Sequence, residues 1–177
     1  MRKFPALILS MGLVAASATA FAGDGHKSDA NVTASVKSAL ISNDQTKASQ
    51  INVETSSGVV QLSGFVDSTA AKAAAETAAL NVEGVKQVQN KLLIRAADRS
   101  TGQVVDDTVI TAKVKGEIAG KAGLDTGSDV NVEVNAGVVE LSGFVATADE
   151  KVRAGELARS INGVKDVHNN ISLKPQG

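Results

Sequence analysis

Two histidines are the side chains of this sequence that titrate near neutral pH unaided, because imidazole loses its proton at about pH 6.5. His26 would be the fourth residue of a chain starting at Gly23, whereas an amino-terminal copper site needs histidine in third place. His168 lies between Val167 and Asn169 on a predicted strand, which places it on the face opposite the core. We interpret both histidines as solvated residues and predict no metal site.

A nucleophile with an oriented base is also missing from the pattern, because the chain has no cysteine and only these two histidines. Asp106-Asp107 and Asp149-Glu150 stand at predicted helix starts, where the helix dipole favours negative charge. Capping therefore explains these carboxylates without acid–base chemistry. We predict no catalytic residue, no cofactor and no small-molecule substrate.

The remaining chemistry is the attraction of lysines to an anionic surface. Lys113 and Lys115 lie on a predicted helix, and each lysine near anionic lipid contributes about 1 kcal/mol. Asp106, Asp107 and Glu117 would offset this attraction, and the helix lacks an aromatic anchor for the membrane interface. Ordinary solvated lysines are the favoured interpretation, and a phospholipid contact at Lys113 and Lys115 is the alternative.

The first 22 residues have the pattern of a secretory signal peptide. Arg2 and Lys3 form a basic start, residues 6–16 are apolar, and 20–22 read small-x-small, as cleavage sites do. The apolar run is too short for a membrane anchor. We therefore predict cleavage after Ala22 and a mature protein outside the cytoplasm.

Charge and composition argue against nucleic acid as a partner. Removing Arg2 and Lys3 leaves 16 basic and 19 acidic residues, a net charge of −3. A nucleic-acid-binding protein typically presents a basic face and stacking aromatics, and this sequence has four Phe but no Tyr or Trp.

An internal repeat organises the rest of the chain. Residues 58–66 read GVVQLSGFV and residues 137–145 read GVVELSGFV, so only Gln61 and Glu140 differ. A match of this length at a fixed offset indicates two copies of one structural unit. The divisions that we predict are a signal peptide over 1–22, a disordered lead over 23–31, a domain over 32–95, a linker over 96–107 and a domain over 108–174.

Each copy is predicted to have the order αββαβ. The first helix has apolar residues at helical spacing, and the second helix begins at a capping residue and buries mainly alanines. In the first copy these positions are Val32, Val36, Ala39 and Leu40, then Ser68, Ala75, Ala78, Ala79 and Val82. In the second copy they are Ile110, Val114 and Ile118, then Thr147 with Glu150, Ala154, Leu157, Ala158 and Ile161.

The strands of each copy follow from alternation. Short strands near 51–53 and 130–132 precede the repeated strand, and the last strand places Val88, Asn90, Leu92 and Ile94, or Val167, Asn169, Ile171 and Leu173, on one face. The intervening helix must carry the chain back across the sheet, so the second and third strands should be parallel. We predict an α+β fold of two tandem domains, each a three-stranded mixed sheet with two helices on one face.

Six repeated glycines are predicted to be structural. Gly58 and Gly137 supply the turn into the repeated strand, and Gly84 and Gly163 stand where a helix C-cap glycine belongs. Inside the strand, Gly64 and Gly143 indicate a helix packed closely over the sheet. Asn90 and Asn169 are expected to bond to neighbouring backbone.

The chain resembles the BON-domain family. The shared pattern is an amphipathic helix, then G-V-V-x-L-x-G, a second helix, and V-x-G-V-x-x-V-x-N-x-L, which here begins at Val82. The second copy of the last motif begins with Ile161 and ends at Ile171. The resemblance implies a periplasmic protein, without catalytic activity, that is induced under osmotic or envelope stress. It also implies binding to envelope proteins or phospholipid surfaces, and a chaperone-like role toward exported proteins.

Two functions remain open at this point. The first is a non-enzymatic periplasmic stress protein that binds envelope proteins or unfolded exported proteins. The alternative is a peripheral module of the periplasm that binds anionic phospholipid.

Overall fold

A computed structural model describes residues 27–46, 51–95, 101–121 and 130–175 of the chain. The first half contains α1 (Asp29–Ile41), β1 (Ile51–Ser56), β2 (Val59–Val66), α2 (Thr69–Leu80), β3 (Gln87–Asn90) and β4 (Leu93–Ile94). The second half contains α3 (Thr101–Lys121), β5 (Val130–Asn135), β6 (Val138–Val145), α4 (Ala148–Arg159), β7 (Asp166–Asn169) and β8 (Ser172–Leu173). The predicted signal peptide and His26 lie outside the described residues.

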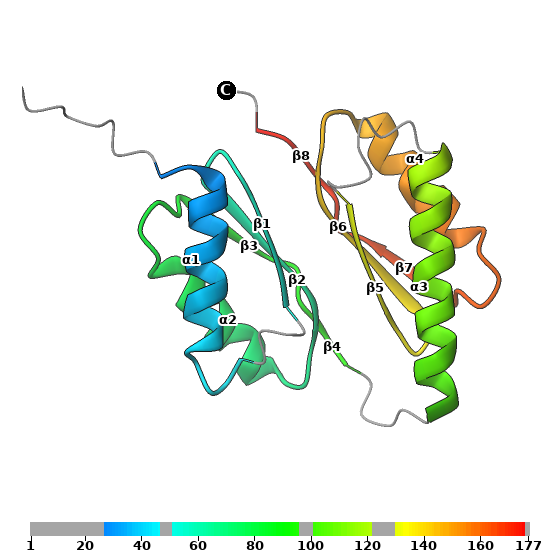
Figure 1. Cartoon of the computed structure of the whole chain (residues 1–177), viewed down its shortest axis with the longest axis horizontal. Coiled ribbons are helices and arrows are strands. Elements are labelled where there is room, and N and C mark those ends of the chain that lie inside the picture. Colours follow the sequence, from blue (N-terminus) through cyan, green and yellow to red (C-terminus); the bar gives the residue numbers. More distant parts are fainter. Residues whose placement is uncertain (1–26, 47–50, 96–100, 122–129, 176–177) are drawn as a thin grey trace, which may run out of the picture.

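Each half folds into a mixed sheet with two helices on one face, which confirms the predicted fold class (Figure 1). β1 runs antiparallel to β2, and β3 and β4 run parallel to β2, as expected for strands joined through a helix. β5, β6, β7 and β8 repeat these pairings in the second half.

The third strand of each half is interrupted, so each sheet has four strands where three were expected. The Asn90 side chain accepts the backbone N–H of Leu92, while the Lys91 N–H donates to the carbonyl of Leu62. This local side-chain bond competes with the regular ladder and turns the strand. Beyond the break, Ile94 and its counterpart Leu173 are about half exposed, which corrects their predicted place in the core.

The core of each half lies between the helices and the sheet, as the helical spacing of apolar residues predicts. Val32, Val36 and Leu40 are buried on α1, and Ala75 and Ala79 on α2. The matching core of the second half is formed by Ile110, Val114, Ile118, Ala154 and Ala158. The predicted N-caps Ser68 and Thr147 are confirmed, and Thr147 forms a capping box with Glu150.

The leading helices begin earlier than the sequence suggested. α1 starts at Asp29, capped by Ser28, inside the predicted lead, and α3 starts at Thr101, inside the predicted linker. A nucleated helix extends through residues that do not oppose it, because each added residue gains a hydrogen bond.

Asp29 and Asp107 do not cap helices; they bind the hairpin turn of their own half. Asp107 accepts the backbone N–H groups of Ala136 and Gly137, each at 2.8 Å, and Asp29 binds Ser57 and Gly58 at 2.7 and 2.8 Å. Both central residues of each turn have positive φ, as a type I′ turn requires. The carboxylate thus fastens the leading helix to the tip of the hairpin, which corrects the capping interpretation of Asp107.

The backbone conformation also explains why the other repeated positions are glycines. Gly84 and Gly163, at φ +95° and +98°, lie in a turn three residues beyond the C-caps Asn81 and Ser160, so they are not C-cap residues themselves. Gly64 and Gly143 have φ +109° and +116° inside their strands, a region that side-chain-bearing residues rarely adopt.

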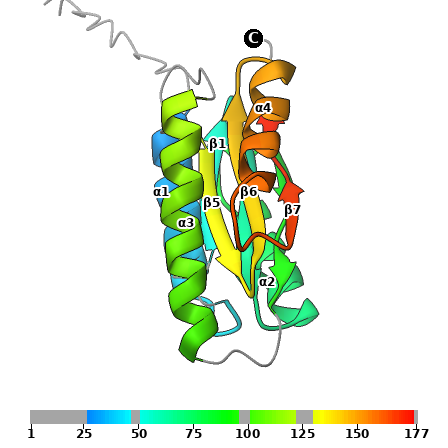
Figure 2. The ribbon, with the colours of Figure 1, turned by 90° about the vertical axis from the view of Figure 1, so that its right-hand side faces the viewer.

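The two sheets pack face to face, with the helices on the outside (Figure 1). Figure 2 shows α3 running beside β5 and α4 beside β7 on the outer surface. We call the facing sides of the sheets the inner faces. Their centre is formed by Gln61 and Ser63 of β2 and by Glu140 and Ser142 of β6, all buried.

Hydrogen bonds join the inner faces in a nearly twofold pattern. Gln61 accepts the backbone N–H of Gly143 at 2.5 Å, and Glu140 accepts that of Gly64 at 2.7 Å. Ser63 and Ser142 bond to each other at 2.7 Å. Two matching amide–carboxylate pairs, Asn52 with Glu133 and Asn131 with Glu54, flank this centre.

Replacing Asp107 with alanine should lower the free energy of unfolding by about 3 kcal/mol. The change removes two hydrogen bonds to a charged acceptor and leaves the buried N–H of Gly137 without that partner. Urea denaturation followed by circular dichroism measures the loss. Asp106→Ala is the matched control, because this neighbour is exposed and should change stability by less than about 0.5 kcal/mol. Equal stabilities of the two variants would contradict the role given to Asp107.

Replacing Gly143 with valine should cost on the order of 2 kcal/mol or more, because a β-branched residue is strained at φ +116°. Gly64→Val should have a similar effect in the first half. Gly116→Val is the matched control, since a Cβ at this helical glycine meets no atom within 4 Å and valine favours a helix more than glycine does. If Gly143→Val melted at the wild-type temperature, the backbone explanation would be wrong.

Candidate functional site

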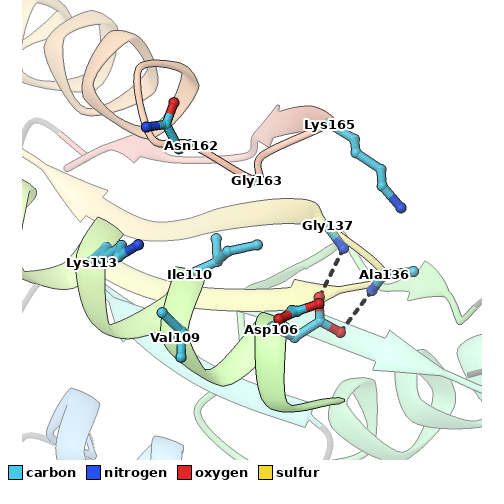
Figure 3. A pocket seen from close by; sticks show the side chains of 10 residues that line it. Asp106, Val109, Ile110, Lys113, Ala136, Gly137, Asn162, Gly163 and Lys165 are labelled. Atoms are coloured by element: carbon cyan, nitrogen blue, oxygen red, sulfur yellow. Dashed lines mark hydrogen bonds between the residues drawn. The ribbon is translucent and has the colours of Figure 1, made fainter. Parts of the chain in front are cut away.

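The second half contains an open cavity of about 350 Å³ between α3, the β5–β6 turn and the turn before β7 (Figure 3). Its floor is made by residues that build the fold. Ile110 packs against Gly163, where an added Cβ would lie 3.0 Å from the isoleucine side chain. Lys165 passes over Gly137 in the same way, at 3.1 Å. The glycines therefore let the helix and the turns approach closely enough to form the cavity.

The rim of the cavity combines charge with apolar surface. Lys113 on α3 and Lys165 before β7 lie on different sides of it (Figure 3). Asn162, Val109, Asp106 and Asp107 also line it, and the valine is 46% exposed. Two ammonium groups, an amide and an exposed valine can bind a ligand that has both an anionic or polar group and an apolar part.

The equivalent cavity of the first half, about 470 Å³, has different chemistry. By the repeat offsets, Asn31, Ser35 and Glu83 occupy the places of Val109, Lys113 and Asn162. An ion pair of 2.8 Å between Lys27 and Glu83 lies beside it and lowers the pKa of Glu83 through its hydrogen bond and charge. The second cavity is thus the more apolar of the two, whereas each cavity is lined by two lysines.

The structure separates the two lysines that the sequence analysis grouped. Both are exposed, but Lys113 lines the cavity and Lys115 does not. Residues two apart on a helix point in different directions, so the pair forms no common patch. Lys115 also has a counterpart, Lys37, in the first half, whereas Lys113 replaces Ser35.

The sequence did not point to Lys165, because the residues that share the cavity with it are distant in the chain. It follows Lys113 by more than fifty positions and matches Lys86 of the first half, so neither spacing nor divergence marks it. Only the contact between α3 and the turn before β7 brings the two ammonium groups to one cavity.

The remaining candidates lie where the sequence placed them. His168 is exposed on β7, 3.4 Å from a carboxylate oxygen of Asp166. Asn90 and Asn169 donate to the backbone carbonyls of Lys72 and Lys151, which confirms their structural role.

Metal sites and membrane spans were also considered for the described parts of the chain. In these parts, no three His, Cys, Asp or Glu side chains are grouped as metal ligands would be. The same parts hold no helix that is both long and apolar enough to span a bilayer.

Comparison with known proteins gives the family context of this site. The chain is 38% identical to osmotically-inducible protein Y of Escherichia coli (strain K12) over 147 residues, 82% of this chain and 73% of that protein. It is 32% identical to outer membrane lipoprotein DolP of Haemophilus influenzae over 78 residues, 44% of this chain and 40% of that protein.

Among solved structures, CdsD, a structural protein of the type III secretion system of Chlamydia trachomatis, aligns at 20% identity with a TM-score of 0.35. That alignment covers 85% of this chain and 65% of CdsD.

The sequence profile of the BON domain matches residues 28–96 and again 106–175. The first segment holds α1 to β4, and the second runs from within α3 to β8. With the repeat, the twice-formed αββαβ fold and this match together, the chain belongs to the BON-domain family.

Proposed function

We propose that this chain is a non-enzymatic periplasmic protein of the osmotic or envelope stress response that binds exported or envelope proteins in a chaperone-like manner. The signal-peptide pattern at its start supports export from the cytoplasm. Relatives named for osmotic induction and for an outer membrane lipoprotein support the setting.

One observation carries the choice of site: the second half has an exposed valine beside an open cavity, where the first half has asparagine. The inner faces of the sheets already bind each other, so partners meet the outer helical surface. An unfolded protein segment could place an apolar side chain against Val109 and Ile110 and its backbone carbonyls near Lys113 and Asn162. Such contacts are sequence-tolerant, as a chaperone-like function needs.

Binding of anionic phospholipid is a second candidate, favoured by the placing of Lys113 and Lys165 on the same cavity. Each ammonium group near an anionic surface contributes about 1 kcal/mol, and Asp106 and Asp107 on the same cavity offset part of this, so the association would be weak and limited to low salt. Both functions would use the same cavity and Lys113, but only the protein contact depends on Val109, so a change at Val109 tests them separately.

For the protein-binding function, Val109→Asn should weaken suppression of aggregation of an unfolded outer-membrane protein by about fivefold. Losing the contact of a half-exposed valine removes about 1 kcal/mol of apolar stabilisation. Light scattering during dilution of the denatured client measures the effect. Val152→Asn, at an exposed valine on α4 that does not line the cavity, is the matched control and should act as wild type. Suppression that is absent in the wild type would refute this function.

For the lipid-binding function, Lys113→Glu should reduce co-sedimentation with vesicles rich in anionic phospholipid by at least tenfold at low salt, since the reversal exchanges an attraction for a repulsion. Lys115→Glu is matched in charge and helix but lies off the cavity, so it should retain most binding. The double variant should not bind. Equal losses in the single variants would indicate diffuse charge attraction, and binding retained by the double variant would exclude α3 as the lipid site.

A further inference from the structure

The one difference within the nine-residue match, Gln61 against Glu140, lies at the centre of the inner faces. Glu140 is 1% exposed, and both of its carboxylate oxygens accept hydrogen bonds. One accepts the N–H of Gly64 from the other half at 2.7 Å, and the other accepts the side-chain amide of Asn170 at 3.0 Å. A carboxyl group is therefore built into the contact between the two BON domains.

The opposite half shows that a neutral group satisfies the same position. Gln61 accepts from Gly143 and donates to the carbonyl of Asn170 and the hydroxyl of Ser172, both at 3.0 Å. The amide thus makes the equivalent contact to a strand glycine without carrying a charge. The interface needs an acceptor at this place and does not need an ion.

Little around Glu140 offsets a negative charge. Its register partners on the same face are Glu133 of β5 and His168 of β7, and Glu133 is itself an acid. Asp166 lies beside His168, and Glu54 faces Asn131 from the other domain. The Lys72 ammonium of α2 exerts a weak attraction but donates its hydrogen bond to the carbonyl of Leu92.

Burial is the largest influence on Glu140 and raises its pKa from 4.5 to about 7. The bonds from Asn170 and Gly64 act in the opposite direction, Glu133 adds to the increase, and Lys72 reduces it. When the domains separate, water reaches the carboxyl and its pKa returns toward the ordinary value.

We propose that Glu140 makes the packing of the two BON domains pH-dependent, with the domains held together most firmly when this carboxyl is protonated. This role goes beyond the proposed function. The packed state holds the proton more tightly than the separated state, so packing is strongest below about pH 4.5 and weakens as the pH rises toward 7. Above that range the carboxyl is ionised in both states, and packing changes no further.

The backbone N–H of Gly143 reports this equilibrium in the full chain. It bonds to Gln61 across the interface and not to Glu140, so its hydrogen exchange follows domain separation rather than the local titration. Exchange should be measured by NMR between pH 5 and 8 and corrected for the intrinsic rate at each pH. We expect protection to fall as the pH rises from 5 to 7, by up to about tenfold per pH unit for one proton, and then to level off.

Two variants assign the effect to its residue. Glu140→Gln keeps the shape, and the Asn170 side-chain amide can turn so that its oxygen accepts from the new amide. Its Gly143 protection should be high and independent of pH. His168→Gln introduces the residue that the first half has at the equivalent position, Gln89. This variant should keep the wild-type pH dependence. Constant protection in the wild type, a pH dependence that survives Glu140→Gln, or loss of packing in Glu140→Gln at every pH would each overturn the proposal.

Discussion

The structure depends on one constraint: the polar inner faces of two sheets must satisfy each other when they are buried. Gln61 and Glu140 do this by accepting a backbone N–H from the strand glycine of the opposite half. Burying an amide or carboxylate without a hydrogen-bond partner would cost more free energy than its packing contacts contribute. These hydrogen bonds therefore decide which faces of the two sheets can pack together. The helices are consequently on the outside, and any partner of the closed molecule meets helices and turns.

The same constraint explains the glycines at Gly64 and Gly143. Each has a positive φ, and each donates its N–H across the interface. Packing of the two halves is thus specified in the backbone of the repeated strand. The differences between the copies include the carboxyl at Glu140 and the rim of the second cavity, where Val109 and Lys113 replace polar residues. These are the places at which the two copies can have separate roles.

Much of each domain could be predicted from local pattern. Helical spacing identified the buried faces of α1 and α3, the Thr147–Glu150 capping box spans only four residues, and the parallel pairing of β2 with β3 follows from the helix between them. The inner faces could not be predicted, because alternating polar residues on a strand look the same whether water or a second sheet covers them. Asp107 was misassigned for a similar reason: its partners lie 29 and 30 positions away, in a turn whose approach depends on the tertiary fold. The cavity also joins distant residues, Lys113 and Lys165, so only one of its two lysines could be singled out from the sequence.

The central claim is that the two domains form one body through their inner faces, and residual dipolar couplings of backbone N–H groups test it most directly. The full chain should be aligned in a dilute neutral medium at about pH 5.5, below the pKa of about 7 that burial gives Glu140. Couplings from α1 to β4 and from α3 to β8 should then fit a single alignment tensor in the orientation described here. Two tensors of different magnitude or direction would show that the domains reorient independently, and would contradict the account.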